Sequence, residues 1–332
     1  MIVEKLENKG KGFLDVAVKN NINLPNEIHK LKKKKNAVIL AHYYQEGDIQ
    51  DIADFVGDSL ALSQQAEKTE ADIILFAGVH FMAETAKILS PNKKVLIPDL
   101  NAGCSLADSC PTDDFREFVS KHPDHTVISY VNTTAEIKAL TDIICTSTNA
   151  VKIVESLPKE DKIIFAPDKN LGNYIKSITG RNMLIWDGAC HVHEEFSLER
   201  ILDLKKEFPG AKIIAHPECD QQILIVADFI GSTSALLKYS INNKSKKYIV
   251  ATEPGIIHQM KKANPDKEFI PAPPKDSACA CNNCAYMKLI SMKKIYNTLK
   301  FEVPEIYLDD SLMKRARLPI KRMLDISEKL GL

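Results

Sequence analysis

The chain has 332 residues, enough for two or three compact domains, which excludes a small domain held together by disulfides alone. Hydrophobic residues make up 45% and charged residues 27%, as in folded globular proteins, which excludes a disordered or fibrous chain. The 44 Lys and Arg residues balance the 44 Asp and Glu residues, so there is no positive surplus to bind nucleic acid or an anionic membrane surface. A small polar ligand is therefore expected.

The sequence also predicts where the protein works. It contains no apolar run long enough to cross a bilayer, and its first residues, MIVEKLENKGKG, lack the apolar core of a signal peptide. We therefore expect a cytoplasmic protein. In that reducing compartment, eight cysteines are expected to be metal ligands, catalytic thiols or buried apolar residues rather than structural disulfides.

In chain order, residues 1–36 predict an N-terminal helical arm that ends in the exposed run Lys32 to Lys35. Three similar apolar segments then follow along the chain, at residues 38–45, 127–132 and 213–218. Each predicts a strand that ends in a polar residue, the first marker: His42, Tyr130 and His216. A second marker lies two residues later, on the same face of the chain: Tyr44, Asn132 and Glu218.

The similarity continues into a second short strand in each repeat, at residues 53–59, 141–147 and 227–233. Each strand breaks into a turn with a hydroxyl residue 17 positions after the first marker: Ser59, Ser147 and Thr233. Taken singly, each hydroxyl is expected to cap the helix that follows. Taken together, three helix N-termini around one site would favour an anion such as a phosphate.

Each repeat continues with a third and a fourth apolar run, and then a cysteine. The three cysteines lie 62, 60 and 68 residues after their first markers: Cys104, Cys190 and Cys284. Alternating strands and helices predict parallel α/β units, each a four-stranded sheet between two helical layers. The expected boundaries are 1–108, 109–195 and 196–285, with a helical extension at 286–332, interrupted at Pro304 and Pro319, that packs back on one unit.

Parallel sheets bind ligands beyond the carboxyl ends of their strands, where every marker lies. If a pseudo-threefold axis relates the three units, then the markers, hydroxyls and cysteines surround one central cavity. The markers are then candidates for proton transfer and hydrogen bonding. His191 and His193, just after Cys190, either face the same cavity or support the Cys190 loop.

Three thiolates from three loops would form a metal site with an incomplete shell. Zinc accepts three Cys and a water, whereas a 4Fe-4S cluster held by three Cys keeps one iron open as a Lewis acid. Cys145 and Cys219 are expected to be buried apolar residues. Cys110, Cys279 and Cys281 receive no definite role, although Cys281 and Cys284 form a CxxC pair of the kind found in zinc and redox sites.

Nine motifs together make the chain resemble the quinolinate synthase family of NAD biosynthesis. In order they are AHYYQ, VGDSL, GVHFMAETAKIL, NAGCSLADSC, YVNTTAEIKA, GACHVHEEF, HPEC, GSTSAL and CNNCAYMKL, from residue 41 to residue 289. The resemblance implies an enzyme that condenses iminoaspartate with dihydroxyacetone phosphate, releasing phosphate and two waters. It also implies a 4Fe-4S cofactor, and it allows transient contact with the enzyme that supplies iminoaspartate.

The resemblance also implies roles for the marker residues. Cys104, Cys190 and Cys284 match the cluster ligands, one from each unit. Residues that match catalytic or substrate-contacting groups are His42, Tyr44, Tyr130, Asn132, His193, His216 and Glu218, with Tyr44 the first choice for acid–base catalysis. Ser59, Ser147 and Thr233 match anion contacts. One departure is Ala278, which stands where some members have the first Cys of a CxxCxxC motif, so regulation by that motif is not expected here.

Two other functions fit parts of the pattern. A non-enzymatic iron–sulfur or zinc sensor would need a docking surface or a DNA-binding element, and the balanced charge argues against the latter. Another 4Fe-4S hydro-lyase would share the open iron. Only the three hydroxyl residues, as contacts for a phosphate, favour quinolinate synthase over that enzyme.

Overall fold

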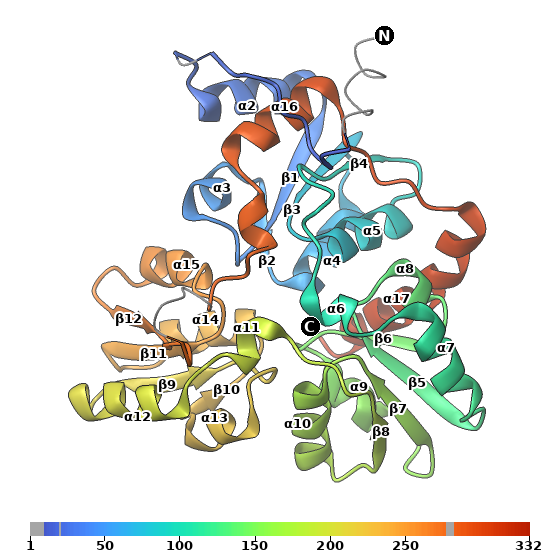
Figure 1. Cartoon of the computed structure of the whole chain (residues 1–332), viewed down its shortest axis with the longest axis vertical. Coiled ribbons are helices and arrows are strands. Elements are labelled where there is room, and N and C mark those ends of the chain that lie inside the picture. The colour runs from blue at the N-terminus through green and yellow to red at the C-terminus, as the bar shows by residue number, and fades with distance from the viewer. Residues whose placement is uncertain (1–9, 20, 277–281) are drawn as a thin grey trace. The chain divides into compact units, whose positions relative to one another are not determined.

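The structure is a computed structural model, and it describes residues 10–19, 21–276 and 282–332 (Figure 1). Cys279 and Cys281, whose roles the sequence left open, lie outside the described residues, as does Ala278. The chain forms two compact parts. The first part comprises residues 1–104 and 285–317, and the second comprises residues 105–284 and 318–332.

The first part contains one four-stranded parallel sheet in the order β2-β1-β3-β4. Its strands are β1 (Ala37–His42), β2 (Phe55–Gly57), β3 (Ile73–Ala77) and β4 (Lys94–Leu96). Its helices are α2 (Leu24–Lys34), α3 (Gly47–Ile52), α4 (Ser59–Lys68), α5 (His80–Leu89), η1 (Met287–Leu289) and α16 (Met292–Phe301). Helices α4 and α5 cover one face, while α2, α3 and α16 cover the other (Figure 1).

The second part contains two sheets with the same strand order, β6-β5-β7-β8 and β10-β9-β11-β12. The strands of the first of these are β5 (His125–Tyr130), β6 (Ile143–Cys145), β7 (Lys162–Ala166) and β8 (Met183–Ile185). Those of the other are β9 (Lys212–Ala215), β10 (Phe229–Ile230), β11 (Lys247–Ala251) and β12 (Glu268–Pro271). All pairings between the named strands of the three sheets are parallel, so the predicted architecture of three four-stranded parallel sheets is confirmed.

Helices cover both faces of each of these sheets (Figure 1). Around β5 to β8 they are α6 (Ser105–Asp108), α7 (Thr112–Ser120), α8 (Ala135–Lys138), α9 (Ala150–Ser156) and α10 (Lys169–Thr179). Around β9 to β12 they are α11 (His191–Glu194), α12 (Leu198–Glu207), α13 (Gln221–Val226), α14 (Thr233–Asn242) and α15 (Ile256–Ala263). The strands are continuous apolar runs because both of their faces are buried.

Side chains from the central strands pack with helix residues in the hydrophobic cores of the sheets. In the third sheet, Ile213 and Ala215 of β9 face the same side, since residues two apart in a strand share a face, and they pack with Ile223 of α13. In the second sheet, Val127 of β5 packs with Ile164 of β7 and Phe115 of α7. This packing places the ends of β1, β5 and β9, and therefore the first markers, at the carboxyl edges of their sheets.

The terminal segments differ in part from expectation. The predicted N-terminal arm contains α2, capped by the Asn23 side chain. Pro304 separates α16 from α17 (Asp310–Lys329), but α17 continues through Pro319, so the predicted interruption at Pro319 is wrong. The packing of the extension on one unit and the boundaries 1–108, 109–195, 196–285 and 286–332 stay predictions. Within the described ranges, no helix combines the length and apolar character needed to cross a bilayer.

Candidate functional site

The first part of the chain contains a His–Tyr pair at the end of β1. His42 is buried, and its Nδ1 accepts a hydrogen bond of 3.2 Å from the backbone N–H of Tyr44. The two rings meet edge to face with centroids 4.4 Å apart. Because Nδ1 is an acceptor, neutral His42 carries its proton on Nε2. This corner therefore presents an imidazole N–H and a half-buried phenol side by side.

The same device recurs at the end of β9 in the second part. His216 Nδ1 accepts a hydrogen bond of 3.3 Å from the backbone N–H of Glu218, again two residues on. Its Nε2 lies 3.1 Å from Ser147 Oγ, so neutral His216 donates to that hydroxyl. The two histidine first markers, His42 and His216, therefore share one tautomer, with the proton on Nε2.

Glu218 is the centre of a buried network in the second part. The Tyr130 hydroxyl donates a hydrogen bond of 2.6 Å to Glu218 Oε1, and His193 Nδ1 lies 3.1 Å from Oε2. The His193 ring stacks on the His216 ring at 4.9 Å, and its Nε2 lies 3.0 Å from Thr252 Oγ1. The network therefore joins first and second markers from two different sheets.

The electrostatics of the network favour an ionised Glu218. Burial alone would raise the pKa of its carboxyl, but the nearby His193 and His216 imidazoles, which favour the carboxylate electrostatically, and hydrogen bonds from His193 and Tyr130 lower the pKa to about 2. Glu218 is 3% exposed, so water contributes little to this stabilisation. At neutral pH the carboxylate is a permanent hydrogen-bond acceptor within the site.

The second marker of the middle repeat, Asn132, carries a buried acceptor without a partner. No hydrogen bond is found to its Oδ1 within the described part of the chain. A buried polar atom of this kind is costly unless a ligand or water satisfies it. Asn132 Oδ1 can therefore accept a hydrogen bond from a water or a ligand.

The three hydroxyl residues do not cap helices, so that expectation is wrong. The caps lie next to them: Asp58 caps α4, and Ser232 caps α14. Ser59 and Thr233 are instead the first residues of these helices, and Ser147 lies before α9, which follows Asn149. The cap is moved by one residue because the short Asp58 and Ser232 side chains reach the N–H groups of the first turn.

The described cysteines fall into two groups. Cys104, Cys190 and Cys284 are half-exposed, whereas Cys110, Cys145 and Cys219 are buried, as predicted for the last two. Burial and the nearby Asp114 charge raise the pKa of the Cys110 thiol to about 12. Burial also raises the pKa of Cys145. Burial and the Glu218 charge raise the pKa of Cys219. Metal binding requires a thiolate, so the half-exposed group is the better set of ligands.

One of these thiols adjoins the Glu218 network. The ligand atoms of Cys190, His193 and Glu218 lie within 4.8 Å of one another, an arrangement compatible with a metal site. Cys190 precedes α11, and the one turn of that helix brings His193 back toward the network. His193 follows Cys190 by three residues and contacts Glu218. Its two expected roles, facing a cavity or supporting the Cys190 loop, stay predictions.

Sequence reasoning missed two buried carboxyl residues beside the cysteines. Asp168 caps α10 through the N–H of Leu171 and also accepts a hydrogen bond from the Cys190 backbone. Glu253 Oε1 accepts a hydrogen bond of 3.3 Å from the Cys284 backbone N–H. Both lie two residues after the last Ala of a third strand, a repeat signal that the sequence contained.

The pKa of Asp168 is shifted in the opposite direction from that of Glu218. Burial and the negative charge of Glu218 raise the pKa of Asp168 well above its usual value. The negative charge on Glu218 therefore favours the protonated form of Asp168.

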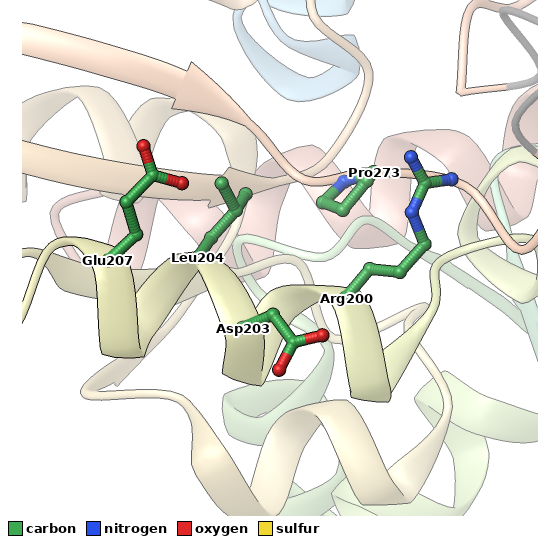
Figure 2. A pocket seen from close by; sticks show the side chains of 5 residues that line it. All are labelled: Arg200, Asp203, Leu204, Glu207 and Pro273. Atoms are coloured by element: carbon green, nitrogen blue, oxygen red, sulfur yellow. The ribbon is translucent and has the colours of Figure 1, made fainter.

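Two surface pockets of the second part lie away from these residues. One, of about 260 Å³, lies along α12 and is lined by Arg200, Asp203, Leu204, Glu207 and Pro273 (Figure 2). Arg200 donates to the Pro274 carbonyl and Asp203 pairs with Lys206, so both charges already have partners. The other, of about 420 Å³, lies between α10 and α13. Neither pocket is lined by a predicted site residue.

The fold and the network define a class: a parallel α/β protein with acid–base side chains and a thiol at the carboxyl ends of its strands, typical of enzymes that act on small molecules. The family model for Quinolinate synthetase A protein matches residues 26–325. The chain belongs to that family, and the resemblance predicted from its motifs is confirmed.

Curated relatives agree with this assignment. The quinolinate synthase of Synechocystis sp. is 63% identical over 300 residues, which cover 90% of this chain and 94% of the relative. That of Chloroherpeton thalassium is 58% identical over 309 residues, covering 93% and 96%. That of Microcystis aeruginosa is 58% identical over 319 residues, covering 95% and 100%.

Proposed function

We propose that this chain is a quinolinate synthase of NAD biosynthesis. In this proposal it condenses iminoaspartate with dihydroxyacetone phosphate and releases phosphate and two waters. The observation that carries the proposal is the buried Tyr130–His193–His216–Glu218 network beside Cys190, in a chain of this family. Such a network can hold and move protons in a site that largely excludes water.

The cofactor in this proposal is a 4Fe-4S cluster held by Cys104, Cys190 and Cys284. The donor set supports it: these three thiols are half-exposed, while the other described cysteines are buried. Soft thiolates select iron–sulfur clusters, and three ligands leave one iron open. When bound, the cluster supplies a Lewis acid for the oxygen or nitrogen atoms of the substrate.

The proton-transfer roles follow from the side chains of this chain. Tyr44 carries a phenol whose hydroxyl can donate or accept a proton. Glu218, ionised at neutral pH, orients the Tyr130 hydroxyl and His193. Asn132 Oδ1 accepts a hydrogen bond from an N–H or O–H group of the substrate. Formation of the pyridine ring needs such donors and acceptors, because protons must leave one atom and reach another.

The hydroxyl residues are proposed to bind the anionic groups of the substrates. Ser59 and Thr233 occupy the first position of ten-residue helices, where backbone N–H groups lack partners within the helix. The positive end of the helix dipole adds to the attraction. Ser147 receives a hydrogen bond from His216, which leaves its own O–H to donate to an anion.

The test is anaerobic purification followed by quantification of iron and sulfide, and then by turnover. We expect about four irons and four sulfides per chain, and quinolinate from chemically generated iminoaspartate and dihydroxyacetone phosphate. Bound zinc without sulfide would overturn the cofactor. An intact cluster that forms no quinolinate, but dehydrates a hydroxy acid, would support the hydro-lyase instead. The cytoplasmic location and the contact with the enzyme supplying iminoaspartate stay predictions.

A further inference from the structure

Two buried polar side chains recur at one position of the repeat, eight residues after the first marker. Gln50 in α3 follows His42 by eight residues, and Lys138 in α8 follows Tyr130 by the same interval. Gln50 is 2% exposed and Lys138 is 0% exposed. Donors buried this deeply need acceptors, and in both cases the acceptors are backbone carbonyls on either side of a second marker.

In the first repeat the marker is Tyr44. Gln50 Nε2 donates to the carbonyl of Tyr43 at 2.9 Å and to that of Gln45 at 2.8 Å. Lys288 Nζ donates to the carbonyl of Tyr44 itself at 2.9 Å. The peptide planes before and after Tyr44 are thus both held, which restricts its φ and ψ and so the direction of the phenol.

In the middle repeat the marker is Asn132. Lys138 Nζ donates to the carbonyl of Val131 at 2.9 Å and also to that of Thr133. The N–H of Thr133 donates to the same Val131 carbonyl at 2.8 Å. Both peptide planes beside Asn132 are therefore fixed, and the side chain they direct is the one with the unsatisfied Oδ1.

The third repeat provides an internal contrast. Leu224 takes the equivalent position and packs against the hydrophobic cluster beneath the third sheet. Its marker, Glu218, is held through its own carboxylate by Tyr130 and His193, and its carbonyl accepts a hydrogen bond of 3.1 Å from Asn170. A buried donor at this repeat position therefore accompanies Tyr44 and Asn132. The third repeat has Leu224 there instead, and its marker Glu218 is held by contacts to its own carboxylate.

We propose that Gln50 and Lys138 are positioning residues that aim Tyr44 and Asn132 at the substrate. This inference rests on the proposed function, since it assigns the two residues an effect on that reaction. Neither of them touches the reacting atoms in this proposal. They act through the backbone, and small displacements of a reacting group lower rates by up to about a hundredfold.

The first experiment compares two substitutions of Lys138. Lys138→Met keeps length and apolar bulk but removes all donors, whereas Lys138→Gln introduces the residue that does the same work in the first repeat. We expect Lys138→Met to lower kcat/KM by about tenfold to a hundredfold, mostly through a higher KM, and Lys138→Gln to regain most of the loss. Lys159→Met, at an exposed position, is the matched control.

A double-mutant cycle separates positioning from general destabilisation. In the Asn132→Ala background there is no side chain left to aim, so adding Lys138→Met should change kcat/KM by less than about twofold. Fully additive losses would show that Lys138 acts elsewhere, and would overturn the proposal for this residue. Equal losses in Lys138→Met and Lys138→Gln would do the same.

The first repeat offers a second test that does not bury or remove a charge. Gln50→Met should lower kcat more than it raises KM, because Tyr44 is proposed to transfer protons, and the loss should disappear in the Tyr44→Phe background. Gln222→Met, at an exposed position, is its control. Wild-type kcat in a folded Gln50→Met variant would overturn the role of Gln50.

Failure of the proposed function would look different. If the wild-type chain with its full iron and sulfide content forms no quinolinate, the function is wrong. If wild type is active and the substitutions leave kcat and KM unchanged, only the positioning is wrong. Circular dichroism and iron content of each variant identify any loss that comes from unfolding.

Discussion

The corner at the end of β1 and the network around Glu218 use the same backbone device for different chemistry. In both, a His Nδ1 accepts the N–H of the residue two positions on, at 3.2 Å for His42 and 3.3 Å for His216. The residue that donates is Tyr44 in one case and Glu218 in the other. The second marker thus gives the two corners different functional groups, a phenol at Tyr44 and a carboxylate at Glu218.

The difference shows how a repeated fold places different functional groups at equivalent strand ends. Tyr44 carries a phenol, whose hydroxyl can donate or accept a proton. The pKa of Glu218 is lowered to about 2 by His193, His216 and Tyr130 despite its burial, so it is ionised. One corner therefore supplies a proton donor and the other a fixed negative charge, on strand ends of the same type.

The largest expected effect concerns the cysteines, on which both corners depend in the proposed function. Replacing Cys104, Cys190 or Cys284 singly with Ala should abolish the cluster and the activity, because three ligands leave none to spare. Cys279→Ala should keep the cluster. The anaerobic visible spectrum of each variant is the measurement. A bleached Cys279→Ala and an intact Cys284→Ala would show that the ligand was misassigned.

The next-largest expected effect tests Tyr44 at the end of β1. Tyr44→Phe removes only the hydroxyl, so the edge-to-face packing on His42 and the cluster should survive. Turnover should fall by about 10²- to 10⁴-fold, the usual contribution of a general acid or base. Anaerobic quinolinate production is measured beside the cluster spectrum. Turnover near that of wild type would move the proton transfer to Glu218 or His193.

Glu218→Gln sharpens the comparison through the pH dependence of stability. A carboxyl whose pKa falls from 4.5 to about 2 on folding stabilises the protein above about pH 4.5, and this contribution is lost as the pH falls toward 2. The variant should be less stable than wild type at pH 7, by on the order of 3 kcal/mol. Urea unfolding from neutral to acid pH should show this difference shrinking. A difference in unfolding free energy that does not change with pH would mean that the Glu218 charge does not stabilise the folded protein.

The smallest expected effect is at Asp168, and its sign is opposite. A carboxyl with a raised pKa favours the folded state most at low pH, and that contribution declines as the pH rises through the folded pKa. Asp168→Asn keeps an oxygen to cap α10, so the stability of the variant relative to wild type should rise with pH. The same urea series measures it. A relative stability that falls with pH would show that Asp168 is ionised in the folded protein.

Much of the fold followed from patterns along the chain. Apolar runs that end in His42, Tyr130 and His216, spaced 88 and 86 residues apart, predicted three parallel sheets, and all three were found with one strand order. The caps were misjudged, because Asp58 and Ser232 compete for the same turn as Ser59 and Thr233. The path of α17 through Pro319 was missed, since proline normally ends a helix.

The sequence by itself determined the repeat, the parallel sheets and the edge at which the polar residues lie, because strand periodicity and parallel pairing are local and regular. Tertiary structure alone decided which side chains meet. The contact of Tyr130 with Glu218 spans 88 residues, and the Glu218 pKa depends on burial, on His193 and His216, and on the hydrogen bond that Tyr130 donates from another sheet. The positioning roles proposed for Gln50 and Lys138 likewise depend on hydrogen bonds to backbone carbonyls. A pattern of residue types does not reveal where those carbonyls lie.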